Sequence, residues 1–273
     1  MKYYFEVFKD ILQLYEDTIE EIEFYDGHFV EMYDLMDGVP EEIEFYGMEA
    51  LKGEGREVLE LCCGNGRITT KLAEMGLLVD GYDLSDSMLE KLHNRLRHLP
   101  KNIHKRIHCE KGDIFTADFR KEYDLVILPA TTICILADDE EKLIQLMNKI
   151  RVCLKPSGRF IFDYRCDFGD TKYKSDMMTI TKKEDNNTSL IIMQEFVNYI
   201  QGRAIANFYG QDIDNHGHIK QHISYTNKKI IVPEDVLSML NKAGMVIERQ
   251  QVIPIDNYDI NFVIAKKGDS HGS

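Results

Sequence analysis

The sequence predicts an α/β fold built on a mostly parallel, doubly wound sheet, and three observations predict it. Short apolar runs suited to buried strands recur along residues 58–163, with helical segments between them. Several of these runs end in an acidic residue. The first of them leads through a Gly-x-Gly turn directly into a helix. Strands that alternate with helices are typical of a parallel sheet covered on both faces.

The turn after the first strand is the most informative stretch of the chain. An apolar strand that contains Glu60 runs into the turn Cys62–Gly66, and the residues that follow read as a helix. Gly64 and Gly66 allow the backbone to turn tightly and to approach a ligand closely. Glu60 would repel a pyrophosphate but suits an ammonium group or a ribose hydroxyl. This unit therefore predicts a ligand that resembles a nucleotide. It argues against a dinucleotide that is bound through its pyrophosphate.

The next strands also end in residues that suit a ligand at one edge of the sheet. The run 77–83 ends in Asp83, about 20 positions beyond the glycines, where a carboxylate can accept from both hydroxyls of a ribose. Ser85 follows as the N-cap of a helix. The three further strands are expected to end at Asp113, Leu128 and Asp163.

Over residues 45–165 the chain resembles the class I S-adenosylmethionine-dependent methyltransferases. The antiparallel strands expected over residues 171–229 resemble the insertion of those members that act on sugar amines, glycine and other small amines. The resemblance implies a Rossmann-like sheet of seven strands with helices on both faces and an antiparallel last strand. It implies S-adenosyl-L-methionine as the cofactor and S-adenosyl-L-homocysteine as its product.

The resemblance also implies which residues hold the cofactor. Glu60 and the glycine turn would lie near the methionine part, and Asp83 would bind the ribose. Asp113 and Ile114 would surround the adenine, while the backbone of Leu128 would lie near the cofactor's amino group. The turn begins with a cysteine where the family usually has Gly or Ala, which implies a tighter pocket. The expected cofactor-binding residues are Tyr46, Glu60, Cys62, Gly64, Gly66, Arg67, Asp83, Leu84, Met88, Gly112, Asp113, Ile114 and Leu128.

Five sections are expected along the chain. They are an N-terminal helical arm and lid (1–50), the S-adenosylmethionine-binding core (51–170), an antiparallel β insertion for the substrate side or an oligomer contact (171–229), a C-terminal helix with the last core strand (230–267) and a disordered tail (268–273).

An apolar stripe at alternating spacings of three and four predicts one long helix over residues 3–23. This helix would pack on its own chain or pair with a second copy in a homodimer. Pro233 is expected to start the C-terminal helix, and residues 261–265 form the last strand. The insertion is expected to contain strands at about 177–183, 189–199, 203–213 and 218–230, with turn residues between them.

The amino-acid composition excludes several classes of binding partner. The chain carries 33 Lys and Arg against 47 Asp and Glu, a formal net charge of −14, which argues against a nucleic-acid substrate. The sequence offers no run that could span a bilayer and no signal-peptide pattern, so a cytoplasmic protein without a membrane partner is expected. Its six cysteines lack metal-ligand spacing, and no metal is expected.

Methyl transfer from a sulfonium is an in-line displacement, so alignment in a dry site is the main catalytic requirement. A neutral amine can attack without a dedicated base. The expected function is therefore methylation of a small-molecule or peptide acceptor, most directly at an amine nitrogen, as in natural-product biosynthesis. Tyr33 and Tyr46 are expected to line the closed site. The expected catalytic residues are Tyr33, Asp163 and Tyr164.

Two alternatives stay open at this point. An O-methyltransferase would need a His or Asp base, and His28, His218 and His222 are the candidates. His218 and His222 would face the same side of one strand, a spacing that also suits a metal but is more often surface polarity. The other alternative is a non-catalytic module that binds the cofactor or a partner on the same fold.

Overall fold

The structure is a computed structural model that describes residues 3–35, 40–166, 173–184, 187–255 and 258–268. The chain divides into two compact units. One, here called the core unit, comprises residues 37–167 and 231–273, and the other, the insertion unit, comprises residues 1–36 and 168–230. Within the described ranges, no helix is long and apolar enough to cross a membrane.

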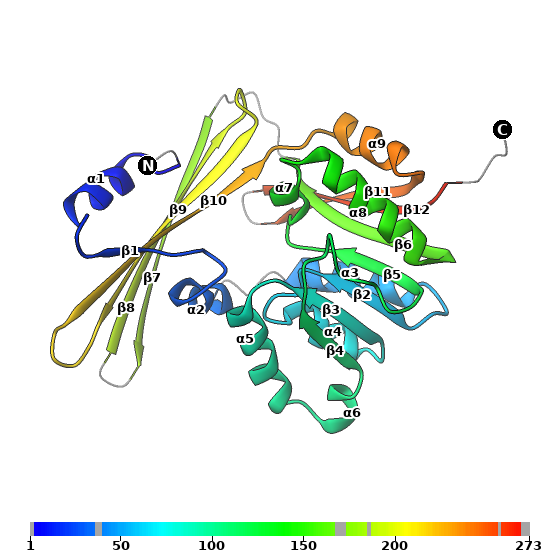
Figure 1. Ribbon diagram of the computed structural model, residues 1–273, viewed down its shortest axis with the longest axis horizontal. Coiled ribbons are helices and arrows are strands. Elements are labelled where there is room, and N and C mark those ends of the chain that lie inside the picture. Colours follow the sequence, from blue (N-terminus) through cyan, green and yellow to red (C-terminus); the bar gives the residue numbers. More distant parts are fainter. Residues whose placement is uncertain (1–2, 36–39, 167–172, 185–186, 256–257, 269–273) are drawn as a thin grey trace. The chain divides into compact units, whose positions relative to one another are not determined.

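The core unit is built on one seven-stranded sheet in the order β11-β12-β6-β5-β2-β3-β4 (Figure 1). β12 runs antiparallel to both of its neighbours, while the pairs from β6 to β4 are parallel. This confirms the predicted doubly wound sheet with an antiparallel last strand. The strands are β2 (Glu57–Leu61), β3 (Leu78–Asp83), β4 (Ile107–Lys111), β5 (Tyr123–Leu128), β6 (Leu154–Arg165), β11 (Met245–Ile255) and β12 (Tyr258–Lys267).

Helices bury both faces of this sheet because successive strand residues point to opposite sides. Leu59 and Leu61 of β2 join one buried cluster with α7, α8 and α9, whereas Val58 joins another with α3 and α4. Ser85 caps α5 as predicted, accepting the N–H of Met88 at 3.1 Å. The helices are α3 (Pro40–Leu51), α4 (Arg67–Glu74), α5 (Asp86–Arg97), α6 (Lys101–His104), α7 (Ile133–Leu136), α8 (Glu140–Cys153) and α9 (Pro233–Lys242).

The insertion unit is a second sheet in the order β1-β10-β9-β8-β7 (Figure 1). β7 to β10 form the predicted antiparallel meander, and β1 joins β10 in parallel. The side of the sheet that carries Tyr209 and Ile223 packs on Tyr4 and Phe8, and the opposite side packs on Phe24 and its neighbours. Its elements are α1 (Val7–Leu14), β1 (Ile19–Glu21), α2 (His28–Leu35), β7 (Tyr173–Glu184), β8 (Asn187–Asn198), β9 (Arg203–Ile213) and β10 (Ile219–Lys229).

The prediction of one helix over residues 3–23 is wrong. α1 ends at Leu14, the chain turns, and Ile19–Glu21 pairs with the edge of β10 instead. The β-branched pair Thr18-Ile19 favours an extended backbone, and the open edge of β10 supplies hydrogen-bond partners that a helix could not use. The strand β11 was also not predicted, because its alternating exposed residues and Pro254 make a weak apolar signal. The predicted tail, apart from Gly268, lies outside the described residues.

Candidate functional site

The candidate site lies in the core unit, where the sheet changes its winding direction. β2 has β3 and β4 on one side and β5 and β6 on the other. In open parallel sheets, ligands bind beyond the carboxyl ends of the strands at such a switch point. The predicted glycine turn follows β2, and Asp83 and Asp163 lie at the carboxyl ends of β3 and β6.

The turn after β2 requires its glycines. Gly64 and Gly66 have φ angles of 54° and 77°, in the left-handed region that side chains rarely adopt. A Cβ on Gly66 would lie 2.7 Å from Cγ of Leu92, and one on Gly64 would lie 3.2 Å from Cε of Met88. Cys62 adopts a φ of 58° at the start of the same turn. A side chain at either position would therefore collide with helix α5, which packs directly against the turn.

Asp83 is fixed in place by two backbone donors. Its Oδ2 accepts the N–H of Gly64 at 2.7 Å, and its Oδ1 accepts the N–H of Ser85 at 2.9 Å. Burial raises the pKa of this carboxyl, while the backbone hydrogen bonds act in the opposite direction. Each carboxylate oxygen keeps a second lone pair, so Asp83 can still accept hydroxyl donors from a ligand.

Two further predicted residues lie beside Asp83 at the ends of β3 and β4. The N–H of Gly112 donates to the carbonyl of Asp83 at 2.9 Å, which ties the two strand ends together. Leu84 is 67% exposed although it is apolar, and Asp113 is also exposed. An exposed leucine between two carboxylates is a surface on which a flat apolar ring with polar edges could lie.

Glu60 is the most perturbed acid of the site. It is 2% exposed, and its Oε2 accepts the hydroxyl of Thr69 at 2.6 Å. Burial raises its pKa to about 8; the Thr69 hydrogen bond and Arg67 oppose the rise, while Glu42 and Asp83 add to it. A buried carboxyl of this kind is partly protonated at neutral pH and would be ionised by a cationic ligand.

Helix α3 contacts the segments that follow β2 and β5 and the end of β6 through two side chains, Glu42 and Tyr46. Glu42 is buried, pairs with Arg67 at the start of α4 and accepts the N–H of Ala130 at 2.8 Å. One turn later, the hydroxyl of Tyr46 donates to Oδ2 of Asp163 at 2.5 Å. Oδ1 of the same carboxylate accepts the N–H of Thr131 at 2.6 Å.

The two carboxylates hold a strained turn after β5. Ala130 and Thr131 have φ angles of 61° and 53°, which are unfavourable for residues with a side chain. Such strain persists only where the surroundings determine the conformation, and it is concentrated at functional sites. Here Glu42 and Asp163 supply the acceptors that fix both backbone N–H groups.

The structure brings most of the predicted site residues to this edge and separates others. Tyr164 follows Asp163 but points to the opposite face of β6, where it is fully buried and its hydroxyl accepts from Nδ2 of Asn261 at 2.8 Å. Tyr33 belongs to the insertion unit, where its ring packs against Phe24 and Tyr25. The catalytic roles of all three stay predictions.

Ile114 and Leu128 lie at the same edge but contribute their side chains to the buried cluster under it. Glu42 and Thr69 are site residues that the sequence did not predict. For Glu42 a signal was present, because it lies four residues before Tyr46 and therefore on the same face of a helix.

Comparison with known proteins agrees with this architecture. Residues 58–158 match a family model described as a methyltransferase domain, which confirms the predicted resemblance for that segment. The cypemycin N-terminal methyltransferase of a Streptomyces species is 30% identical over 142 residues, which cover 51% of this chain and 55% of that protein. The curated relatives that the chain matches are covered over less than two thirds of their length.

Solved structures match almost the whole chain. The CcbJ methyltransferase from Streptomyces caelestis superposes with a TM-score of 0.68 at 20% identity and covers 90% of this chain and 98% of its own. The glycopeptide N-methyltransferase MtfA, solved with S-adenosyl-L-homocysteine, superposes with a TM-score of 0.64 at 20% identity and covers 97% of this chain and 98% of its own. At these identities the likeness shows the fold.

Proposed function

We propose that this protein transfers a methyl group from S-adenosyl-L-methionine to a small-molecule or peptide acceptor, at an amine nitrogen. The observation that carries the proposal is the edge at the switch point of the core sheet. There a glycine turn with left-handed backbone angles, a fixed Asp83 and a buried Glu60 lie together. The methyltransferase-domain match over residues 58–158 supports the same assignment.

The donor set at this edge fits the cofactor. Asp83 would accept from the ribose hydroxyls, and the exposed Leu84 with Asp113 and the 112–114 turn would take the adenine. Glu60 would face the positively charged methionine part, since its carboxyl gains from a nearby cation. When bound, the cofactor supplies an electrophilic methyl group on its sulfonium.

The protein's own contribution is then orientation and exclusion of water. Asp163 already accepts from Tyr46 and Thr131 with its two oxygens, so we assign it to holding Tyr46 and the turn after β5. The pKa of Tyr46 lies well above its ordinary value because the side chain is buried beside Asp163. Tyr46 therefore stays a neutral hydroxyl that can position an acceptor and does not act as a base.

An amine acceptor agrees with this positioning role, because a neutral amine can attack without a dedicated base. Among the similar proteins, one is named for methylating the N-terminus of cypemycin, one is a glycopeptide N-methyltransferase and KedS8 is a sugar N-methyltransferase. We assign acceptor recognition to the N-terminal arm, with Tyr33, and to the β insertion. The acceptors named for these proteins differ in size, from a sugar amine to a modified peptide.

A hydroxyl acceptor is the second candidate, and one observation favours it. Nδ1 of His28 lies 2.8 Å from Oδ2 of Asp212, an arrangement that could serve as a general base. The ubiquinone biosynthesis O-methyltransferase of Coxiella burnetii is also 26% identical to this chain over 109 residues.

Two experiments test the proposal. S-adenosyl-L-methionine and S-adenosyl-L-homocysteine should each raise the unfolding temperature, whereas NAD should not, because only a ligand that prefers the native state stabilises it. Equal shifts with NAD, or none with any of the three, would contradict the assignment. Intact-mass measurement of candidate amines and peptides after incubation with the cofactor would then identify the acceptor by a gain of one or more methyl groups.

The dependence of turnover on pH separates nitrogen from oxygen. With an amine acceptor, the rate should rise towards the pKa of the amine itself, and Asp163→Asn should slow turnover without changing that slope. A rate that is flat from about pH 6 to 9 and falls about 100-fold or more in His28→Asn would instead favour the hydroxyl acceptor.

A further inference from the structure

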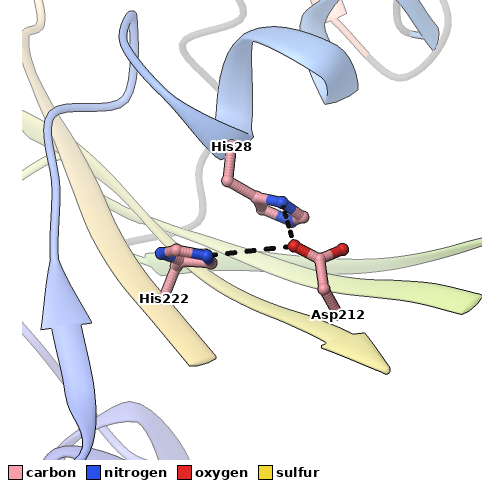
Figure 2. Close-up of side chains that lie close together, drawn as sticks. All are labelled: His28, Asp212 and His222. Carbon is pink, nitrogen blue, oxygen red and sulfur yellow. Dashed lines mark ion pairs between the residues drawn. The ribbon is translucent and has the colours of Figure 1, made fainter. Parts of the chain in front are cut away.

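Two imidazoles and a carboxylate meet in the insertion unit, and the amine methylation proposed above assigns them no role. Nδ1 of His28 lies 2.8 Å from Oδ2 of Asp212, and Nε2 of His222 lies 3.9 Å from the same oxygen (Figure 2). The three ligand atoms all lie within 4.8 Å of one another. The two rings are stacked, with centroids 4.8 Å apart and planes inclined by 15°. We call these three residues the His–Asp–His cluster.

The cluster depends on the register of the sheet. Gly210 of β9 is paired with His222 of β10, and Asp212 follows two residues later on the same face of the sheet. His28, at the start of α2, places its ring over Gly210: a Cβ there would lie 2.6 Å from Cδ2 of His28. The absence of a side chain at position 210 therefore makes room for the third member of the cluster.

A neighbouring hydroxyl holds the carboxylate in place. Oγ of Ser189, on β8, donates to Oδ1 of Asp212 at 2.6 Å and leaves Oδ2 directed at the two imidazoles. Ligands of a metal ion are commonly oriented by such outer hydrogen bonds. The cluster and its neighbouring hydroxyl come from three paired strands and one helix, so the ligand atoms are held in place before an ion binds.

One member of the cluster, Asp212, borders a hollow of about 410 Å³ in the insertion unit, which Ser189, Asp214 and His218 also line. His222 itself is only 4% exposed, and among the described residues its Nδ1 has no hydrogen-bond partner. The same is true of Nε2 of His28. Both of these are the ring nitrogens that do not face Oδ2 of Asp212, so neither is a candidate ligand atom.

Both imidazoles can offer a ring nitrogen to a metal ion. A neutral imidazole keeps one nitrogen lone pair for a ligand bond. Glu20 lies 3.6 Å from Nδ1 of His222 and is more than half exposed, so it stands outside the set of three.

We propose that His28, Asp212 and His222 form a binding site for a divalent transition-metal ion of the zinc class. Two imidazoles and one carboxylate are a donor set that such ions accept, with remaining coordination positions open to water or to a ligand. The ion would lie between Nδ1 of His28, Oδ2 of Asp212 and Nε2 of His222, replacing the hydrogen bond that now joins the first two. The site requires neither the cofactor nor an acceptor.

This assignment differs from the sequence expectation of no metal and from the pair considered there. His218 and His222 both lie near the end of the meander, but His218 is exposed and its Nδ1 lies 2.9 Å from Oδ2 of Asp214 in the turn. Only folding brings His28 to His222, because the two are separated by the core sequence. His218 is therefore the natural control: a histidine beside an aspartate that lies outside the cluster.

The test is titration of the full-length, chelator-treated protein with Zn²⁺ by calorimetry and with Co²⁺ by visible absorption. Wild type should bind one equivalent of Zn²⁺ and give the absorption bands of protein-bound Co²⁺. His222→Gln and Asp212→Asn should each weaken binding by about 100-fold or more, beyond the 10–100-fold loss typical of an outer partner. Ser189→Ala should fall within that smaller range, and His218→Gln should bind as wild type does.

Asp212→Asn preserves the shape of the side chain, and unfolding in the presence of chelator shows whether each variant is folded. Binding to wild type should also release protons and weaken below about pH 6, because the ligands must lose theirs. Two results would overturn the proposal. One is absence of stoichiometric Zn²⁺ binding to wild type, which would leave a hydrogen-bonded cluster only. The other is binding lost in His218→Gln but kept in His222→Gln, which would place the ion at the exposed turn.

Discussion

Replacing Asp83 by Ala tests the proposed cofactor site most directly. The carboxylate accepts the N–H groups of Gly64 and Ser85 at 2.7 and 2.9 Å, so it is already aligned before any ligand binds. A hydrogen bond between a ligand and a charged group contributes about 1.5–3 kcal/mol. Loss of the ribose contact should therefore weaken binding of S-adenosyl-L-homocysteine by about 10- to 150-fold.

The same substitution also removes two hydrogen bonds within the protein, each worth about 1.5–3 kcal/mol because the acceptor is charged. The unfolding temperature should fall by about 2–4 °C for each kcal/mol lost. A control variant must therefore lose comparable internal bonds without touching the site. Asp124 serves this purpose: it lies near the start of β5, at the opposite edge of the sheet, and accepts the N–H of Glu57 at 3.0 Å and a contact from Lys155 at 2.8 Å.

Calorimetric titration with S-adenosyl-L-homocysteine and thermal unfolding should be carried out on both variants. Asp124→Ala should lower the unfolding temperature and leave the dissociation constant unchanged, whereas Asp83→Ala should change both. If the two variants bound the ligand equally well, the placement of the ribose at Asp83 would be refuted. If both lost affinity in proportion to stability, the effect would be one of folding.

Three further predictions concern the same edge of the sheet. Gly66→Ala should lower both stability and cofactor affinity, because its φ of 77° is strained for alanine and the new Cβ would lie 2.7 Å from Leu92; unchanged binding in titration would contradict the required close approach. Tyr46→Phe should lower the free energy of unfolding, measured by chemical denaturation, by about 1–3 kcal/mol, since Asp163 loses a buried donor. In steady-state kinetics the same variant should lose more in kcat than in cofactor affinity. An equal loss in kcat and in cofactor affinity would contradict the positioning role. Glu60 should make cofactor affinity pH-dependent, because its pKa of about 8 in the free protein falls when a cation binds. Affinity measured by titration should therefore rise from about pH 5 to about pH 8 and then level off. A Glu60→Gln variant that kept this pH dependence would show that Glu60 does not cause it. The effect on the stability of the free protein has the opposite direction. Above the ordinary pKa of 4.5 the unfolded state loses a proton that the folded state retains, so the stability contributed by Glu60 should decrease as pH rises towards about 8.

The sequence by itself determined the features that depend on neighbouring residues. Apolar runs with turn residues between them predicted the parallel strands and the meander, because strand and turn preferences are written in short segments. The glycine turn, Asp83 at a strand end and the Ser85 cap lie within about one strand–turn–helix unit. Their arrangement follows from local backbone geometry together with the right-handed winding of parallel strands.

The tertiary structure alone decided which distant groups meet. The hydrogen bond from Tyr46 joins residues 117 positions apart, and the one from Ala130 to Glu42 joins residues 88 positions apart. Neither hydrogen bond could be predicted from a periodic sequence pattern. Such a pattern shows which face of a helix or strand a residue lies on, but not which distant residue it contacts. The same holds for Tyr164, whose neighbour Asp163 points to the opposite side of the strand.

The N-terminal segment shows why this must be so. Its apolar spacing predicted one helix, yet the exposed edge of β10 offered backbone partners to Ile19–Glu21, and pairing there replaced the last part of the helix. His28 then reaches His222 only because this segment folds onto a sheet that the chain forms much later. Contacts of that kind are decided by the packing of whole elements, since the free energy of an open strand edge or a buried imidazole depends on what the rest of the chain brings to it.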